Sequence, residues 1–159
     1  MNTAYKTVLV ALPPMTHEWY GRPVDAIRRA AATLGSAPGV RLVFISVFSL
    51  EQELGTGQVN LLPPEDLEQI VLFHERKHRD GMNAYLKWFA DNGVEHEVIV
   101  LQGDPADVIL HTARERGADL ILMGHHHKTG LLNIFGSDIT ARVSKHLPCD
   151  LMVITPGEE

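Results

Sequence analysis

The sequence predicts one α/β domain, residues 1–159, built on a doubly wound, open parallel sheet of five strands in the order 3-2-1-4-5 with helices on both faces. Two observations predict this fold class. Short apolar stretches alternate with longer stretches in which apolar residues recur every three or four positions, as strands alternate with helices. The short stretches are apolar throughout, which is typical of parallel strands buried on both faces of a sheet.

The apolar pattern defines five strands and four helices. The predicted strands are residues 7–12, 40–48, 95–103, 118–124 and 149–156, and the predicted helices are residues 22–35, 64–92, 104–117 and 137–147. The strands are rich in valine, isoleucine and leucine, which suit a buried sheet. Residues 49–63 show no period and contain glycine and proline, so this stretch is predicted to be a loop.

Proline, glycine and small polar residues mark the ends of the helices. Pro23 suits the first turn of the first helix and Gly35 suits its end. Asp104 can cap the third helix, and Pro105 fits the turn that follows. Ser137 is the predicted cap of the last helix. The helix ends marked by these residues coincide with the positions where the helical spacing of apolar residues begins and ends.

The longest helix carries one apolar stripe along its length. Its members are Leu67, Val71, His74, His78, Met82, Tyr85 and Phe89. His74 and His78 are four residues apart, which is a spacing compatible with metal ligation. Their position on an apolar stripe favours partly buried histidines with a structural role.

Composition excludes several classes of function. The formal net charge is −6 and lysine and arginine form no cluster, so no nucleic-acid partner is expected. No apolar run approaches the ~20 residues that a membrane span needs. Cys149 is the only cysteine, which fits a reducing compartment, and the expected location is the cytoplasm.

In folds of this class, ligands bind outside the carboxyl ends of the strands, where the strand order reverses. With the order 3-2-1-4-5, this position lies between the first and fourth strands. The loops that face it are residues 13–20 and 124–135. The second of these loops contains three consecutive histidines and leads to the pair Gly136-Ser137 at the start of the last helix.

Three stretches give the chain a resemblance to a known family. They are "LQGDPADVIL" (101–110), "ADLILMG" (118–124) and "GSDITARVSKHLPCDLMVI" (136–154). Together with the element order, they resemble the universal stress protein family. One branch of this family binds ATP through glycine, two residues, glycine, nine residues and a glycine followed by serine or threonine. That branch also has an aspartate after the first strand, close to the ribose.

The chain departs from this nucleotide motif at two places. Gly124 and Gly136-Ser137 match its ends, but His127 stands at the second glycine and only eight residues separate it from Gly136. Leu12-Pro13-Pro14 replaces the aspartate. A histidine restricts the backbone where glycine would let phosphate approach, and the prolines remove two N–H donors. These features resemble the branch that is not known for tight nucleotide binding.

The resemblance implies a set of contacts if ATP or AMP binds. Adenine would lie near the main chain of two residues, and the phosphates would lie at the loop and at the helix start, whose N–H groups favour anions. The candidate residues are Val47, Met123, Gly124, His126, His127, Gly136, Ser137 and Asp138. Asp138 also compensates the helix dipole and competes with a phosphate, so Ser137 and Asp138 have an alternative interpretation as an ordinary helix start.

Adjacent residues of an extended loop point apart, so at most two of His125, His126 and His127 can share an ion without unusual backbone geometry. The sequence therefore predicts no metal except Mg²⁺ bound with a nucleotide. No catalytic residue is predicted either, because Asp138 is the one carboxylate offered near a γ-phosphate.

The expected function is that of a non-catalytic universal stress protein with weak or absent ATP or AMP binding. Family members resemble each other in forming homodimers through the last strand, where Met152 and Ile154 would pack. Two alternatives remain open at this point. One is an enzyme that slowly hydrolyses ATP or transfers its phosphoryl group, and the other is a ligand-free module that binds a protein partner.

Overall fold

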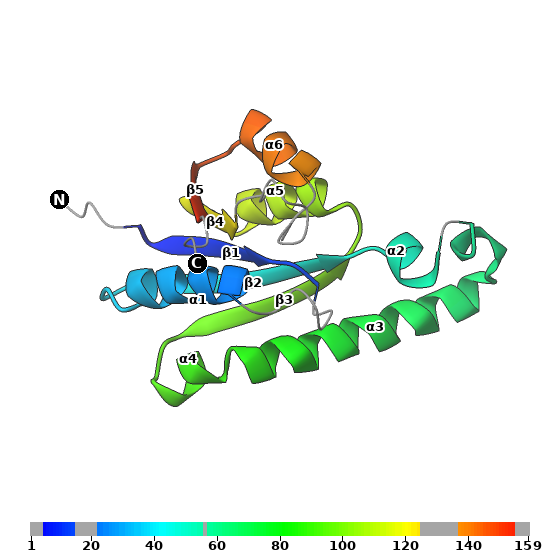
Figure 1. Cartoon of the computed structure of the whole chain (residues 1–159), viewed down its shortest axis with the longest axis horizontal. Coiled ribbons are helices and arrows are strands. Elements are labelled where there is room, and N and C mark those ends of the chain that lie inside the picture. The colour runs from blue at the N-terminus through cyan, green and yellow to red at the C-terminus, as the bar shows by residue number, and fades with distance from the viewer. Residues whose placement is uncertain (1–4, 15–21, 56, 125–136, 155–159) are drawn as a thin grey trace.

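The computed structural model describes residues 5–14, 22–55, 57–124 and 137–154. Its sheet has five parallel strands in the order β3-β2-β1-β4-β5, which confirms the predicted fold class. The strands are β1 (Thr7–Leu12), β2 (Arg41–Phe48), β3 (His96–Gln102), β4 (Leu120–Gly124) and β5 (Asp150–Ile154). Figure 1 shows them as one twisted layer.

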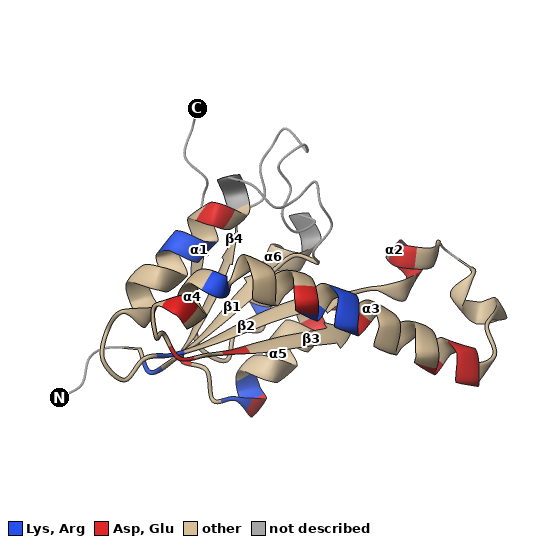
Figure 2. Cartoon of the chain, turned by 90° about the horizontal axis from the view of Figure 1, so that it is seen from below, with Lys and Arg blue, Asp and Glu red and all other residues tan. Residues whose placement is uncertain are grey.

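Helices cover both faces of this layer. They are α1 (Arg22–Gly35), α2 (Leu50–Leu54), the 3-10 helix η1 (Val59–Leu61), α3 (Pro64–Tyr85), α4 (Lys87–Asp91), α5 (Pro105–Glu115) and α6 (Ser137–Lys145). In Figure 1, α1, α3 and α4 lie below the sheet and α5 and α6 lie above it. Figure 2, seen from below, shows acidic and basic residues interspersed along the ribbon of the described helices. None of the described helices is long and apolar enough to cross a membrane.

Two predicted boundaries are wrong. The stretch predicted as a loop, residues 49–63, contains α2 and η1. A helix of five residues is too short to show a period, and α2 is fixed by tertiary contacts such as the burial of Leu50, which is 2% exposed. The predicted helix 64–92 breaks at Leu86, between α3 and α4. No proline or glycine marks that break, and the apolar period continues across it, so the sequence pattern gives no sign of it.

The core centres on β1, whose residues Val8 to Leu12 are at most 2% exposed. Asp119, just before β4, fixes where this strand begins. Its carboxylate accepts the backbone N–H groups of Lys6 at 2.9 Å and Thr7 at 3.0 Å, and its own N–H donates to the Thr7 carbonyl at 3.0 Å. These three bonds align β1 with β4, so that Val8 lies beside Leu120.

Asp104 connects the two helices on the upper face. As predicted, it caps α5, because its carboxylate accepts the N–H of Asp107 at 3.1 Å. The same carboxylate accepts two hydrogen bonds from the Arg142 guanidinium on α6, at 3.0 and 2.9 Å. These bonds from Arg142 are the main reason that the pKa of Asp104 lies below its ordinary value. The described part of α6 begins at Ser137, and the side chain of that predicted cap lies outside the described residues.

We expect Asp104→Ala to lower the free energy of unfolding by about 1–2 kcal/mol, because it removes a helix cap together with a half-exposed ion pair. The pKa of Asp104 is lower in the folded state than in the unfolded state. The stabilisation that Asp104 provides is therefore complete above the ordinary carboxyl pKa. It is lost as the pH falls through the lowered pKa that Asp104 has in the folded state. The difference between wild type and variant should narrow below about pH 4.

Urea unfolding at several pH values measures this difference. Asp107→Ala is the matched control, because the Asp107 side chain is 75% exposed and has one Arg142 contact at 3.3 Å. Asp107→Ala should lower the free energy of unfolding by clearly less than Asp104→Ala does. An equal cost for the two variants, or a cost of Asp104→Ala that does not change with pH, would contradict this account.

Candidate functional site

The strands β1 and β4 separate at their carboxyl ends. Their ladder runs from Val8–Leu120 to Val10–Leu122. Beyond it, β1 stays paired with β2 as far as Leu12–Ser46, while β4 stays paired with β5 as far as Gly124–Ile154. Each strand follows its outer neighbour, so the two strands part where the strand order reverses, which is the position of the predicted ligand crevice.

Three of the predicted site residues lie at this edge of the sheet. Val47 is the last residue but one of β2, and Met123 and Gly124 end β4. Val47 and Met123 are 4% and 0% exposed, respectively, because they belong to the core. The main-chain contacts that the resemblance implies for adenine therefore stay predictions.

The remaining predicted residues can be placed only in part. Ser137 and Asp138 are the first described residues of α6, but their side chains lie outside the described residues. His126, His127 and Gly136 also lie outside the described residues, as does His125. The contacts predicted for phosphate groups therefore stay predictions.

The end of β1 offers little to a ribose. Leu12 is 2% exposed and Pro13 is buried, so the segment that replaces the family's aspartate packs into the core. Neither proline has an N–H group to donate. The chain thus lacks both a carboxylate and main-chain donors at this point.

Ser46 is a polar residue near this edge that the sequence analysis missed. It lies beside Leu12 in the sheet and is 1% exposed. Its hydroxyl is buried and has no hydrogen-bond partner among the described residues. A buried hydroxyl without a partner is unfavourable, so Ser46 is available to bond a ligand or a water molecule. The sequence signal is a single serine inside the apolar stretch of β2.

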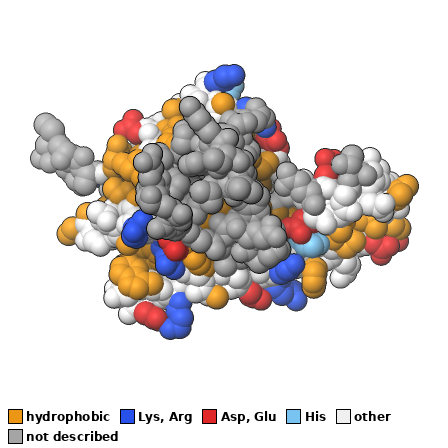
Figure 3. All heavy atoms as spheres, in the orientation of Figure 1, with side chains coloured by type: hydrophobic (Ala, Val, Ile, Leu, Met, Phe, Trp, Pro, Cys, Tyr) orange, Lys and Arg blue, Asp and Glu red, His pale blue; other side chains and the backbone are white. Residues whose placement is uncertain are grey.

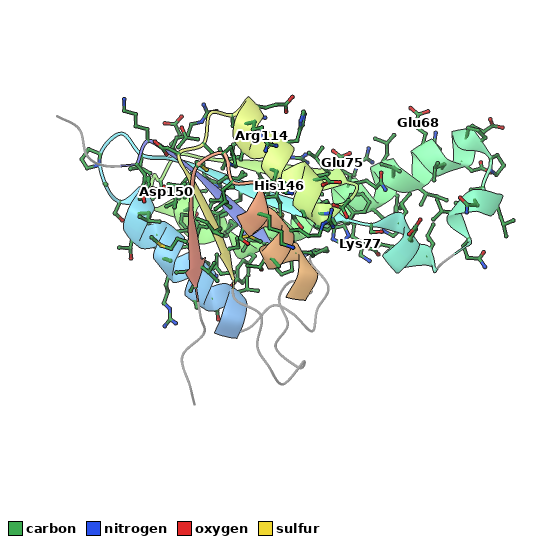
Figure 4. The ribbon with its side chains drawn as sticks, turned by 90° about the horizontal axis from the view of Figure 1, so that it is seen from above. Glu68, Glu75, Lys77, Arg114, His146 and Asp150 are labelled. Carbon is green, nitrogen blue, oxygen red and sulfur yellow. The ribbon has the colours of Figure 1, made fainter. Side chains whose placement is uncertain are left out.

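A second hollow, of about 660 Å³, lies on the other side of β2, beside α5. It is lined by residues from the end of β3, from α5 and from the end of α6, among them Gln102, His111, Arg114 and His146. Figure 4 shows Arg114 and His146 close together, and the Arg114 guanidinium donates to the His146 carbonyl at 3.0 Å. This bond anchors the arginine to the end of α6.

Polar side chains also gather just beyond the end of β2. The helix α2 brings Glu53 against His74 and His78 of α3. The burial predicted for the two histidines is confirmed, since their side chains are 12% and 1% exposed, respectively. The sequence could not identify Glu53 as their partner, because it lies in the stretch predicted as a loop.

Comparison with known proteins gives a consistent result. A model of the universal stress protein family matches residues 5–155. Universal stress protein MJ0531 of Methanocaldococcus jannaschii is 39% identical over 94 residues, which cover 58% of this chain and 55% of that protein. The chain spans about half the length of the curated relatives it matches.

Solved structures share the fold at low sequence identity. The structure of hypothetical protein MJ0577 has a TM-score of 0.70 at 20% identity, and the alignment covers 99% of this chain and 100% of that one. A universal stress protein family protein from Arabidopsis thaliana, solved with AMP bound, has a TM-score of 0.63 at 17% identity, covering 96% and 92%. At these identities the likeness supports the fold alone.

Proposed function

The chain belongs to the universal stress protein family, and from this premise we propose that it is a non-catalytic regulator of the stress response. In this proposal it acts in the cytoplasm as a homodimer and binds ATP or AMP weakly. The single observation that carries the nucleotide part is the separation of β1 and β4 after Val10 and Leu122. The AMP bound to the Arabidopsis thaliana relative supports the choice of ligand.

The chemistry at the crevice supports weak binding. Ser46 adds a buried hydroxyl that has no partner among the described residues, and the resemblance implies main-chain contacts from Val47 and Met123 to adenine. Against these, Pro13 and Pro14 provide neither a carboxylate nor an N–H group for the ribose. His127 also stands where the family's motif has a glycine. The contacts that are missing are those to the ribose and to the phosphates. These two groups provide most of the polar contacts of a nucleotide, so weak binding is expected.

The same chemistry argues against phosphoryl transfer. Such a reaction needs a carboxylate that holds Mg²⁺ and a group that orients the nucleophile. Asp138 is the one carboxylate that the sequence offers near the predicted phosphate position. One group cannot fill both roles, so binding without catalysis is the proposed activity.

One observation favours the alternative of a ligand-free interaction module. The segment formed by α2, η1 and the start of α3 projects from the body as an arm (Figure 1). Apolar side chains on the arm are exposed, namely Leu61 at 77%, Phe73 at 65% and Leu72 at 48%. Exposed apolar groups of this kind are common at protein-binding surfaces.

The last strand supports the homodimer. β5 lies at an edge of the sheet, and Leu151 to Ile154 are only half-buried. An apolar edge strand with free backbone groups tends to pair with another strand. Pairing of β5 with its copy in a second chain would satisfy these groups and bury the apolar side chains in a two-fold symmetric dimer.

Isothermal titration with Mg-ATP and with AMP tests the nucleotide proposal. We expect dissociation constants in the upper micromolar to millimolar range. His127→Gly should tighten binding several-fold, because it restores the glycine of the motif, and Ser137→Ala should weaken it by removing a hydroxyl donor. His125→Gly is the control, since residue 125 is not a motif position.

Two results would count against this proposal. Absence of binding in both wild type and His127→Gly at millimolar nucleotide would favour the interaction module. Release of phosphate from ATP by the wild type that is lost in Ser137→Ala would favour the enzyme.

Light scattering tests the dimer. We expect the wild type to have the mass of two chains and Val153→Asp the mass of one, because a carboxylate at the centre of the paired strands would be desolvated next to its copy. Phe73→Asp is the control, since it makes the same type of change on the arm and should leave the mass unchanged. A monomeric wild type, or a dimeric Val153→Asp, would refute the proposed interface.

A further inference from the structure

We propose that Glu53, His74 and His78 form a binding site for a divalent transition-metal ion of the zinc class, joining α2 to α3. One potential ligand atom from each side chain lies within 4.8 Å of the other two. The two oxygens of Glu53 divide between the histidines. Oε1 lies 2.7 Å from His78 Nε2, and Oε2 lies 3.5 Å from His74 Nδ1.

These separations suit one shared ion. Zinc binds histidine nitrogen at ~2.0–2.1 Å in a tetrahedral arrangement, which places neighbouring ligand atoms about 3.3 Å apart. The 3.5 Å separation is within about 0.2 Å of this value, and the 2.7 Å separation needs the Glu53 carboxylate to withdraw by about 0.6 Å. Glu53 belongs to a five-residue helix that ends at Leu54, just before Gly55, so a movement of this size requires no change in the sheet.

Unsatisfied nitrogen atoms give independent support. His74 Nδ1 is buried and has no hydrogen-bond partner among the described residues, although it faces Glu53 Oε2. Such atoms are rare in folded proteins, because a buried polar atom without a partner lowers stability. An ion between His74 and Glu53 would give this nitrogen the partner that it lacks.

The surroundings favour a positive ion. Within the described part of the chain, Glu53 forms ion pairs with these two histidines and with no lysine or arginine. Its carboxylate is only 16% exposed, and a buried carboxylate needs a nearby positive charge. The Phe48 ring lies 5.2 Å from that of His78 and 6.2 Å from that of His74, which limits access of water. Figure 3 shows histidine at the surface where the arm joins the body.

The ligand set identifies the class of ion. Two imidazoles and one carboxylate are typical of zinc sites with three protein ligands and one open position. Residues 74–78 read His-Glu-Arg-Lys-His, which is the H-E-x-x-H pattern of zinc-binding helices. In that pattern the glutamate acts as a base, whereas Glu75 bonds to Arg79 at 3.4 Å and its side chain is 34% exposed. We therefore assign metal binding to this site and no hydrolytic step.

The second ring nitrogen of His78 sets the expected strength of the site. In tight zinc sites, this nitrogen usually donates to a carboxylate or a carbonyl, which orients the ring. His78 Nδ1 has no such partner among the described residues. A dissociation constant in the micromolar range is therefore expected. This assignment differs from the sequence-based expectation of no metal apart from nucleotide-bound Mg²⁺, because the position of Glu53 became visible only in the fold.

Zinc titration of the chelator-treated full chain tests the proposal. The background is a variant with His125, His126 and His127 all changed to alanine, which removes the other histidine cluster. This background should bind one Zn²⁺ per chain. Glu53→Gln and His74→Gln should each weaken that binding at least ~10-fold, which is the lower range seen even for groups that only support a ligand. Both changes keep a side chain of similar size at these positions. His78 is left unchanged, because its side chain is 1% exposed and its replacement would disturb the packing of the core.

His111→Ala is the matched control. His111 and Glu115 form an exposed pair at 3.2 Å with the same four-residue spacing, so loss of a surface histidine by itself should not alter binding. Zn²⁺ should also raise the Tm of the background and of His111→Ala but not that of Glu53→Gln.

Co²⁺ reports on the ligands directly. It should give the visible absorption of a four-coordinate ion without a sulfur-to-metal band, because the proposed ligands are two histidines and a glutamate and include no cysteine. The proposal is overturned if Zn²⁺ binding disappears in the alanine background, or if Glu53→Gln and His74→Gln bind as tightly as that background.

Discussion

The carboxylate of Asp119 holds the beginnings of β1 and β4 together, and the geometry at their opposite ends depends on this contact. By accepting the N–H groups of Lys6 and Thr7, it aligns the two strands at the reversal point of the sheet. Aligned there, the strands share three residue pairs before each follows its outer neighbour. The parting of the two strands at their carboxyl ends follows from their unequal partners, with no need for a special loop conformation.

The end of β2 serves two separate features of the molecule. Val47 belongs to the core and lies at the edge of the sheet where the resemblance implies adenine. Phe48, the next residue, contacts the ring of His78, and the chain then continues into α2, which carries Glu53. One strand end therefore lies beside both candidate sites, the nucleotide site through Ser46 and Val47 and the metal site through Phe48. Any change of register in β2 would disturb both.

Much of the fold could be predicted from the sequence because its signals are local. The apolar stretch of β1, the cap at Asp104 and the glycine at the end of α1 act within a few residues and agree with one another. The break at Leu86 could not be predicted, since the apolar period crosses it unchanged. The helix α2 was missed because it is short and held by contacts with distant residues.

The candidate sites were predictable to different extents. The edge of the sheet that contains Val47, Met123 and Gly124 follows from the predicted strand order, because ligands in this class of fold bind where that order reverses. Glu53 and His74 are brought together by folding, and no spacing in the sequence indicates that contact. The hydroxyl of Ser46 is similar, because a serine in a strand acquires meaning only once its burial is known.

The central claim is that the opening between β1 and β4 is where this chain meets its ligand. Amide chemical-shift changes during titration with AMP, followed by NMR, test it most directly. The account predicts that the largest changes occur at Val47, Met123 and Gly124. Changes gathered instead at Gln102, His111 and Arg114, around the hollow beside α5, would contradict it.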